Sequence, residues 1–255
     1  MIVFVLPLVI GVFWLAYFFM PPPRGLPILA YRNLTDLCSD GRSITSNQLN
    51  QHLQLIKELG YQTISFAELE KFRKDPALLP PKPVLLTFDG SYETICRVVY
   101  PVLTKHGLRG TVFVPASSIG SFSRLEDGIE KNLDHDMMRT LHSGGVEFAL
   151  SPESNVDATR VEENIQCSIT ALEETGCAFS RVYAYPDKFN PRRPLRNGLR
   201  TALKTGRIDF AVQLAPGVND LRLKNPYRLR RVVIRAGDTP RDLENKLIKG
   251  RGRWI

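Results

Sequence analysis

Short apolar runs recur along the chain between residues 26 and 234, and each has the length of a strand rather than of a helix. Continuous apolar runs of this kind are typical of parallel strands that are covered on both faces. The pattern predicts eight strands: Leu26–Tyr31, Tyr61–Phe66, Val84–Phe88, Gly110–Val114, Val146–Leu150, Val182–Tyr185, Phe210–Leu214 and Leu229–Ile234.

Helical patterns separate most of these runs. Capping boxes at Thr45 and Ser65 each predict a helix start, and Thr239 followed by Pro240 predicts another. Amphipathic spacing predicts two further helices, Ser91–Lys105 and Thr159–Glu174. Alternating strands and helices indicate right-handed βαβ units, and therefore a barrel or an open doubly wound sheet.

Residues 1–20 carry no charged side chain. A helix of this length spans roughly 30 Å, which is the thickness of the hydrocarbon core of a bilayer. The segment lacks the basic start and the small-residue cleavage site of a signal peptide, so we expect an uncleaved transmembrane anchor. Residues 21–25 form a Pro-rich spacer, and one domain follows over residues 26–250.

Composition adds little about the fold but bears on partners. The 255 residues include 34 Lys and Arg against 26 Asp and Glu, a net charge of +8, which favours anionic partners. The four cysteines lack CxxC spacing, which argues against a Cys-rich zinc site; Cys167 and Cys177 could pair in an oxidising compartment. No nucleic-acid-binding motif is present, and the sequence sets no oligomeric state.

Chemistry in such α/β folds lies at the carboxyl ends of the strands. Polar residues follow four predicted strands, at Arg32, at Asp89, around Ser151 and at Asp187. For Asp89 two interpretations stay open, because an Asp at this place is also a common N-cap of the next helix.

Several segments together resemble polysaccharide deacetylases, the NodB-homology group or carbohydrate esterase family 4, and most closely the branch that acts on poly-N-acetylglucosamine. The segment Leu79–Asp89 resembles the one that carries the first motif of the family. The order and spacing of the other matching pieces support it: Pro27–Tyr31, Leu59–Ser65, Tyr100–Leu103, Lys105–Val114, Ala184–Pro186 and Asn225–Arg231. The resemblance implies a distorted (β/α) barrel.

The resemblance also implies a reaction, the metal-assisted hydrolysis of an N-acetyl group. In the family one Asp and two His hold a divalent metal, usually zinc, which polarises the acetyl carbonyl and activates water. A second Asp is the general base and a His is the acid.

Most of this machinery is replaced in the present chain. Asp89 falls on the base, whereas Gly90 falls on the metal-binding Asp, and Ser151 and Asn155 fall on the two His. Arg32 stands in place of the acid His, and Asp187 follows the Pro of the third motif. Neutral hydroxyl and amide groups are poor zinc ligands, so we expect no bound zinc and a catalytically inactive protein.

Three functions therefore stay open. The first is a membrane-anchored module that binds a cell-surface polysaccharide outside the cytoplasm, with Tyr31, Tyr92 and Tyr185 as candidate ligand-binding residues or as core residues. The second is a hydrolase with a rebuilt site, which could include hard oxygen ligands for calcium or magnesium (Asp89, Glu153, Asp157 and Asp187). The third is electrostatic binding of an anionic polymer or lipid by a basic helix face (Arg193, Arg196, Arg200, Lys204 and Arg207).

Overall fold

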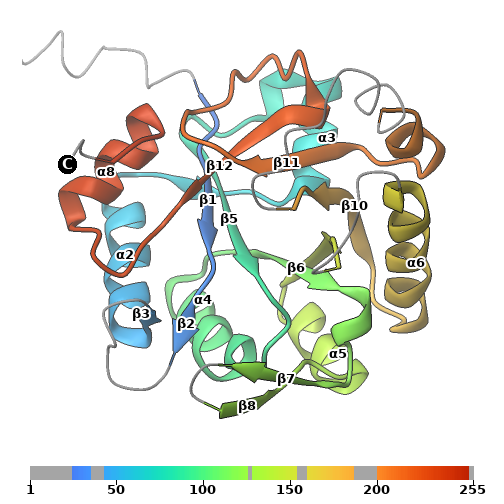
Figure 1. Ribbon diagram of the computed structural model, residues 1–255. Helices are drawn as coiled ribbons and strands as arrows, with labels where there is room; N and C mark the ends of the chain where they lie inside the picture. The colour runs from blue at the N-terminus through green and yellow to red at the C-terminus, as the bar shows by residue number, and fades with distance from the viewer. Residues whose placement is uncertain (1–24, 36–42, 126–127, 154–159, 187–199, 253–255) are drawn as a thin grey trace, which may run out of the picture.

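Parallel strands closed into a barrel form the centre of the molecule in the computed structural model, which describes residues 25–35, 43–125, 128–153, 160–186 and 200–252 (Figure 1). The strands run in the order β1 (Ile28–Tyr31), β12 (Leu229–Val233), β11 (Phe210–Leu214), β10 (Phe179–Ala184), β9 (Glu147–Ser151), β6 (Thr111–Pro115) and β5 (Pro83–Asp89). Because β1 also pairs in parallel with β5, the sheet closes on itself. The eighth strand, β4 (Gln62–Thr63), pairs with the beginning of β5.

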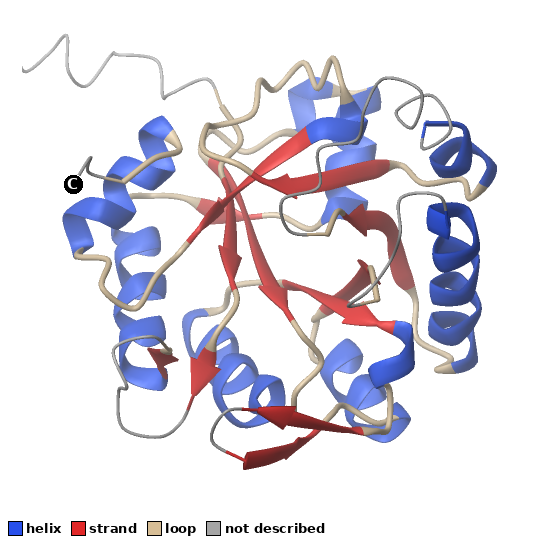
Figure 2. Ribbon diagram, viewed as in Figure 1, coloured by secondary structure: helices blue, strands red, loops and turns tan. Residues whose placement is uncertain are grey.

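Helices surround this barrel on its outer face (Figure 2). They are α2 (Ser46–Glu58), α3 (Phe66–Lys74), α4 (Tyr100–His106), α5 (His135–Ser143), α6 (Val161–Glu174) and α8 (Pro240–Lys249). Short helical turns join some elements: η1 (Pro76–Leu78), η2 (Ile95–Val99), η3 (Ala116–Ser118) and η5 (Pro226–Arg228). Two small sheets complete the fold, β2 (Leu34–Thr35) with β3 (Ile44–Thr45) and β7 (Phe122–Leu125) with β8 (Gly128–Lys131).

Strand alternation divides the apolar side chains into two cores. Along β5, Leu85 belongs to the cluster inside the barrel, whereas Leu86 belongs to the layer between the barrel and the helices. Phe66, at the start of α3, closes the barrel at the amino ends of the strands; its ring lies 6.2 Å from that of Phe113 and 6.1 Å from that of Phe210. The carboxyl ends of the strands form the opposite, polar end, which we call the mouth.

The two predicted capping boxes and the predicted helix start at Thr239 are confirmed, and Thr239 also forms a capping box. Thr45, Ser65 and Thr239 each accept a hydrogen bond from the third residue of the helix that follows, whose side chain bonds back to the cap. The cap at Ser65 also explains a difference from the prediction, since the expected strand Tyr61–Phe66 is limited to the two residues of β4 and α3 begins at Phe66.

The predicted helix Ser91–Lys105 also differs from the structure. It begins later, with a π-turn at η2, and continues as α4. Pro101 lacks the N–H that would bond to the carbonyl of Arg97, so a regular α-helical ladder is interrupted at this point.

Two expectations concern the membrane anchor and a disulfide bond. The predicted anchor at residues 1–20 is outside, and from Gly25 onward no described helix is long and apolar enough to cross a bilayer. Cys167 is exposed and Cys177 is buried, and both are free thiols, so the pairing that we considered is not formed.

Candidate functional site at the barrel mouth

The side chain of Asp89 projects into the barrel at the end of β5 and is bound by a buried arginine from β12. Arg231, only 2% exposed, places one guanidinium nitrogen on Oδ1 of Asp89 and the other 3.3 Å from Oδ2. The same guanidinium group lies 4.7 Å from the centre of the Phe113 ring, a cation–π contact. Thr87 Oγ1 accepts a further hydrogen bond of 3.4 Å from Arg231 and donates to the carbonyl of Leu29.

A second arginine reaches the same carboxylate from β1. The Nε atom of Arg32 lies 3.5 Å from Oδ2 of Asp89, and the Asp89 side chain is 19% exposed. Two guanidinium groups therefore surround one carboxylate, and the three side chains together carry one net positive charge. Such fork-like pairing fixes the orientation of Asp89 and holds positive charge on both of its oxygens.

The residues that the structure describes do not fit the zinc that the family resemblance implies. Gly90 offers no donor atom, and its backbone has φ of +103°, a conformation that other residues rarely adopt. A Cβ atom built on Gly90 would lie 3.0 Å from Cε2 of Tyr92. The position of the expected metal-binding Asp is thus adapted to glycine in both backbone and surroundings.

The other predicted site residues are placed only in part. Ser151 ends β9 and is paired with Pro115, at the rim of the mouth, whereas Asn155 and Asp187 lie outside the described residues. Among the described residues, no group of three or more His, Cys, Asp or Glu side chains is arranged to hold a metal.

The alternative oxygen site is not supported by the contacts of its described members. Asp89 is engaged by the two arginines, and Glu153 accepts hydrogen bonds from both the main chain and the hydroxyl of Ser117. Asp157 and Asp187 lie outside the described residues.

Two of the three candidate tyrosines lie in the core outside the barrel. Tyr31 is fully buried and stacks on Phe88, and burial raises the pKa of its hydroxyl above the ordinary value. Tyr185 is nearly buried and donates a hydrogen bond to the carbonyl of Tyr227. This burial favours packing roles for both. Tyr92 is half-buried beside Gly90 and forms a β-bridge with Asn132, so it is the member of the three that lies at the mouth.

The sequence analysis missed two features of the site. Arg231 was part of a matching segment, and its alternation with the buried Val232 along β12 could have placed it inside the barrel. The second is a polar network behind the rim. Ser91 Oγ donates to Asn132, whose amide nitrogen donates to Ser121 and Ser123.

Comparison with known proteins agrees with this architecture. The family model described as polysaccharide deacetylase matches residues 78–201. The Bacillus subtilis protein YxkH, which bears the name of a polysaccharide deacetylase, is 30% identical over 225 residues, 84% of this chain and 73% of its own length. The chain belongs to the polysaccharide deacetylase family.

Other proteins are similar to this polysaccharide deacetylase-like chain over a shorter stretch of sequence or in their fold. The poly-β-1,6-N-acetyl-D-glucosamine N-deacetylase of Escherichia coli is 31% identical over 84 residues, which are 32% of this chain and 12% of that protein. In structure, the chain is similar to the Streptococcus pyogenes deacetylase PplD and to IcaB from Ammonifex degensii, each with a TM-score of 0.72 and 20% identity. The alignments cover 90% and 89% of this chain and 99% and 97% of the two structures. These structural likenesses support the barrel fold.

Proposed function

We propose that this polysaccharide deacetylase-like protein binds a polysaccharide at the barrel mouth without hydrolysing it. The observation that carries the proposal is the arrangement around Asp89, where Arg231 and Arg32 are paired with the carboxylate and Gly90 replaces a metal-binding side chain. A general base needs an accessible lone pair and, in this reaction, a Lewis acid beside it. Both arginines compete with a substrate water for the Asp89 carboxylate, and the described residues include no group of three or more ligating side chains for the Lewis acid.

The proposal that the chain binds a polysaccharide is supported by its similarity to a protein named for a polysaccharide substrate. A relative is named for its action on poly-β-1,6-N-acetyl-D-glucosamine. The mouth retains hydrogen-bonding groups suited to sugar hydroxyls, including the guanidinium of Arg32, which is 40% exposed.

Membrane attachment through residues 1–20 is part of the proposal, and the fold is compatible with it. Leu26 pairs with Asn219 at the amino end of β1, which is the end of the barrel opposite the mouth. An anchor that precedes this point would leave the mouth directed away from the bilayer. We infer only from the family resemblance that the domain lies outside the cytoplasm. Alkaline extraction of membranes tests the attachment, because an anchored chain stays in the pellet and a cleaved chain is released.

The catalytic part is tested by amine release from β-1,6-linked and β-1,4-linked N-acetylglucosamine oligomers, with and without added zinc or cobalt. We expect no release above background, together with measurable binding of at least one oligomer by calorimetry. Metal-dependent release that is lost in Asp89→Asn would instead establish a hydrolase with a rebuilt site.

A further inference from the structure

The β7–β8 hairpin carries an exposed face that the barrel mouth does not explain. Phe122 is 69% exposed and Ile129 is 71% exposed, although both are apolar and lie in regular strands. Phe122 is opposite Lys131 and Ile129 is opposite Arg124 in the antiparallel register, so the four side chains share one face. We call these four residues the hairpin face.

The opposite face of the hairpin is bound to the body of the protein. Ser123 accepts a hydrogen bond of 2.8 Å from Asn132, and Glu130 accepts one of 3.0 Å from the main chain of Thr94. Glu130 also lies 3.5 Å from a guanidinium nitrogen of Arg97. Ser123 and Glu130 thus point inward, whereas Phe122 and Ile129 are left outside beside the two basic side chains of the hairpin face, which is unusual for large apolar residues.

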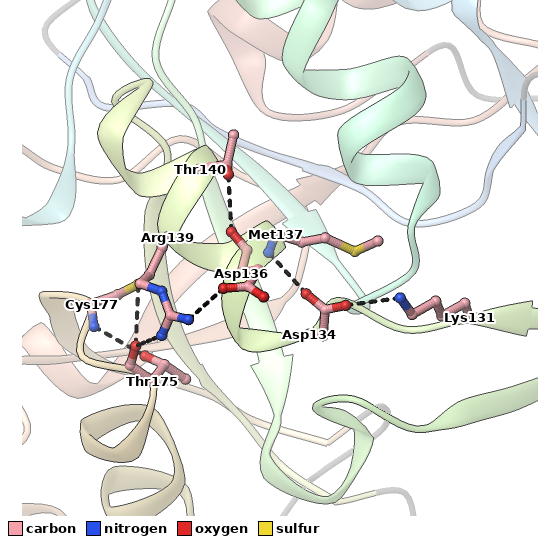
Figure 3. Close-up of polar contacts among 8 residues, drawn as sticks. All are labelled: Lys131, Asp134, Asp136, Met137, Arg139, Thr140, Thr175 and Cys177. Carbon is pink, nitrogen blue, oxygen red and sulfur yellow. Dashed lines mark hydrogen bonds and ion pairs between the residues drawn. The ribbon is translucent and has the colours of Figure 1, made fainter.

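The base of the hairpin is fixed as well. Lys131 forms an ion pair of 2.8 Å with Asp134, which caps α5 by accepting a hydrogen bond from Met137 (Figure 3). In the same view Arg139 joins α5 to the carbonyl of Thr175, after α6. The hairpin face is therefore fixed to α5, and α5 is in turn bonded to the end of α6.

The hairpin is continuous with the mouth. The main chain of Ser91, two residues after Asp89, accepts a hydrogen bond of 2.5 Å from Leu133, and the main chain of Glu93 donates one of 2.9 Å to Lys131. A linear polymer that occupies the mouth would have the hairpin face beside it at the same end of the barrel (Figure 1).

The geometry points to the hairpin face as a second binding surface for the polysaccharide chain, beyond the sugars held at the mouth; this inference rests on the proposed function. The apolar C–H faces of sugar rings would pack on Phe122 and Ile129, and Arg124 would donate hydrogen bonds to hydroxyl or acetyl oxygens.

The experiment compares a trisaccharide with a decasaccharide of β-1,6-linked N-acetylglucosamine, titrated into the full chain by calorimetry. In the double variant Phe122→Ser, Ile129→Ser we expect the Kd of the decasaccharide to rise about 10-fold, the usual effect of losing a stacked aromatic contact, and that of the trisaccharide to stay within about 2-fold. Phe122→Tyr keeps the ring and should retain the affinity. The matched control is Leu78→Ser, which removes another exposed apolar side chain (59% exposed) from η1 and should change neither Kd.

The outcomes separate this inference from the proposed function. Binding of neither oligomer by the unmodified chain would overturn both. Equal affinity for the two oligomers, or an unchanged decasaccharide Kd in the double variant, would overturn the hairpin face alone. So would a double variant that keeps its sugar affinity but no longer sediments with phosphatidylserine-containing vesicles, since that result would assign the face to lipid.

Discussion

Among the described residues, an inward-facing carboxylate lies at each end of the barrel, Glu147 at the amino end and Asp89 at the mouth, and the two have different partners. At the amino end, Glu147 accepts hydrogen bonds from the main chain of Phe66 and Ala67 and from the hydroxyls of Thr111 and Ser180. At the mouth, Asp89 is bound by two guanidinium groups. The partners of Glu147 are neutral, and its bonds to Phe66 and Ala67 hold the start of α3 against the barrel. The partners of Asp89 are positively charged and compensate its negative charge.

This difference indicates that the two ends of the barrel serve different purposes. The amino end of a (β/α) barrel serves the fold, and the carboxyl end carries the reaction. Here the amino end is closed by Phe66 and Glu147 accepts four hydrogen bonds, while at the mouth ion pairs and a glycine stand where the family resemblance places a metal and an acid. The predictions below test the two ends against each other.

Removal of the buried Arg231 at the mouth should lower the free energy of unfolding more than any other substitution considered. Arg231→Met leaves Asp89 with one partner, and loss of one member of a buried ion pair costs about 3 kcal/mol in the free energy of unfolding. Urea denaturation measures this loss. The double variant Asp89→Asn, Arg231→Met should recover part of it, because no uncompensated charge remains; a loss below about 1 kcal/mol in the single variant would contradict the pairing.

At the amino end, Glu147→Gln should cost somewhat less. Four donors bond to the two carboxylate oxygens of Glu147, and the amide of Gln offers them a single oxygen. We therefore expect a loss of about 2 kcal/mol in the free energy of unfolding. Glu153→Gln is the matched control at the mouth, where the carboxylate accepts hydrogen bonds from the exposed Ser117, and should cost about 0.5 kcal/mol. Equal losses in the two variants would remove the distinction between the ends.

Substitution of the glycine at the mouth tests the backbone. Gly90→Ala should lower the free energy of unfolding by about 1–2 kcal/mol, because φ is positive and the new Cβ approaches Tyr92. Gly237→Ala, where a Cβ atom meets nothing within 4 Å, should be nearly neutral. If both variants are equally stable, the mouth is not adapted to glycine and Gly90→Asp becomes a route back to a metal site.

The smallest effect concerns pH. Burial lowers the pKa of His52 below its ordinary value of 6.5, against an opposing contribution from Asp238 and with a supporting one from Lys246. The unfolded chain then binds the proton more readily, so stability is full well above pH 6.5 and falls as the pH drops through and below it.

Denaturation of the His52→Asn variant between pH 7.5 and pH 5.5 checks this expectation. The variant should lose much of the pH dependence, whereas His135→Asn, at the exposed histidine that begins α5, should retain it. An unchanged pH dependence in His52→Asn would show that His52 is not the group responsible.

Local sequence signals predicted the framework well. The capping boxes at Thr45, Ser65 and Thr239 and the apolar runs depend on residues close in the chain, so the helix starts and barrel strands could be placed. The closure of β1 against β5 could not be derived from these signals, and came from the family resemblance.

The site was predictable only where it has a local motif. Asp89 and Gly90 follow a recognisable strand, but Arg231 reaches Asp89 across 142 positions and depends on closure of the barrel. The β7–β8 hairpin was missed because its strands are short and rich in charged residues, which weakens the alternation expected of a sheet.

Titration of the metal-free full chain with zinc tests the central claim most directly, since the account holds that the mouth has lost its metal. Calorimetry should detect no binding tighter than about 100 μM, as expected for a site without imidazole or thiolate ligands. Stoichiometric zinc binding below 1 μM that is abolished in Ser151→Ala or Asp89→Asn would contradict the account.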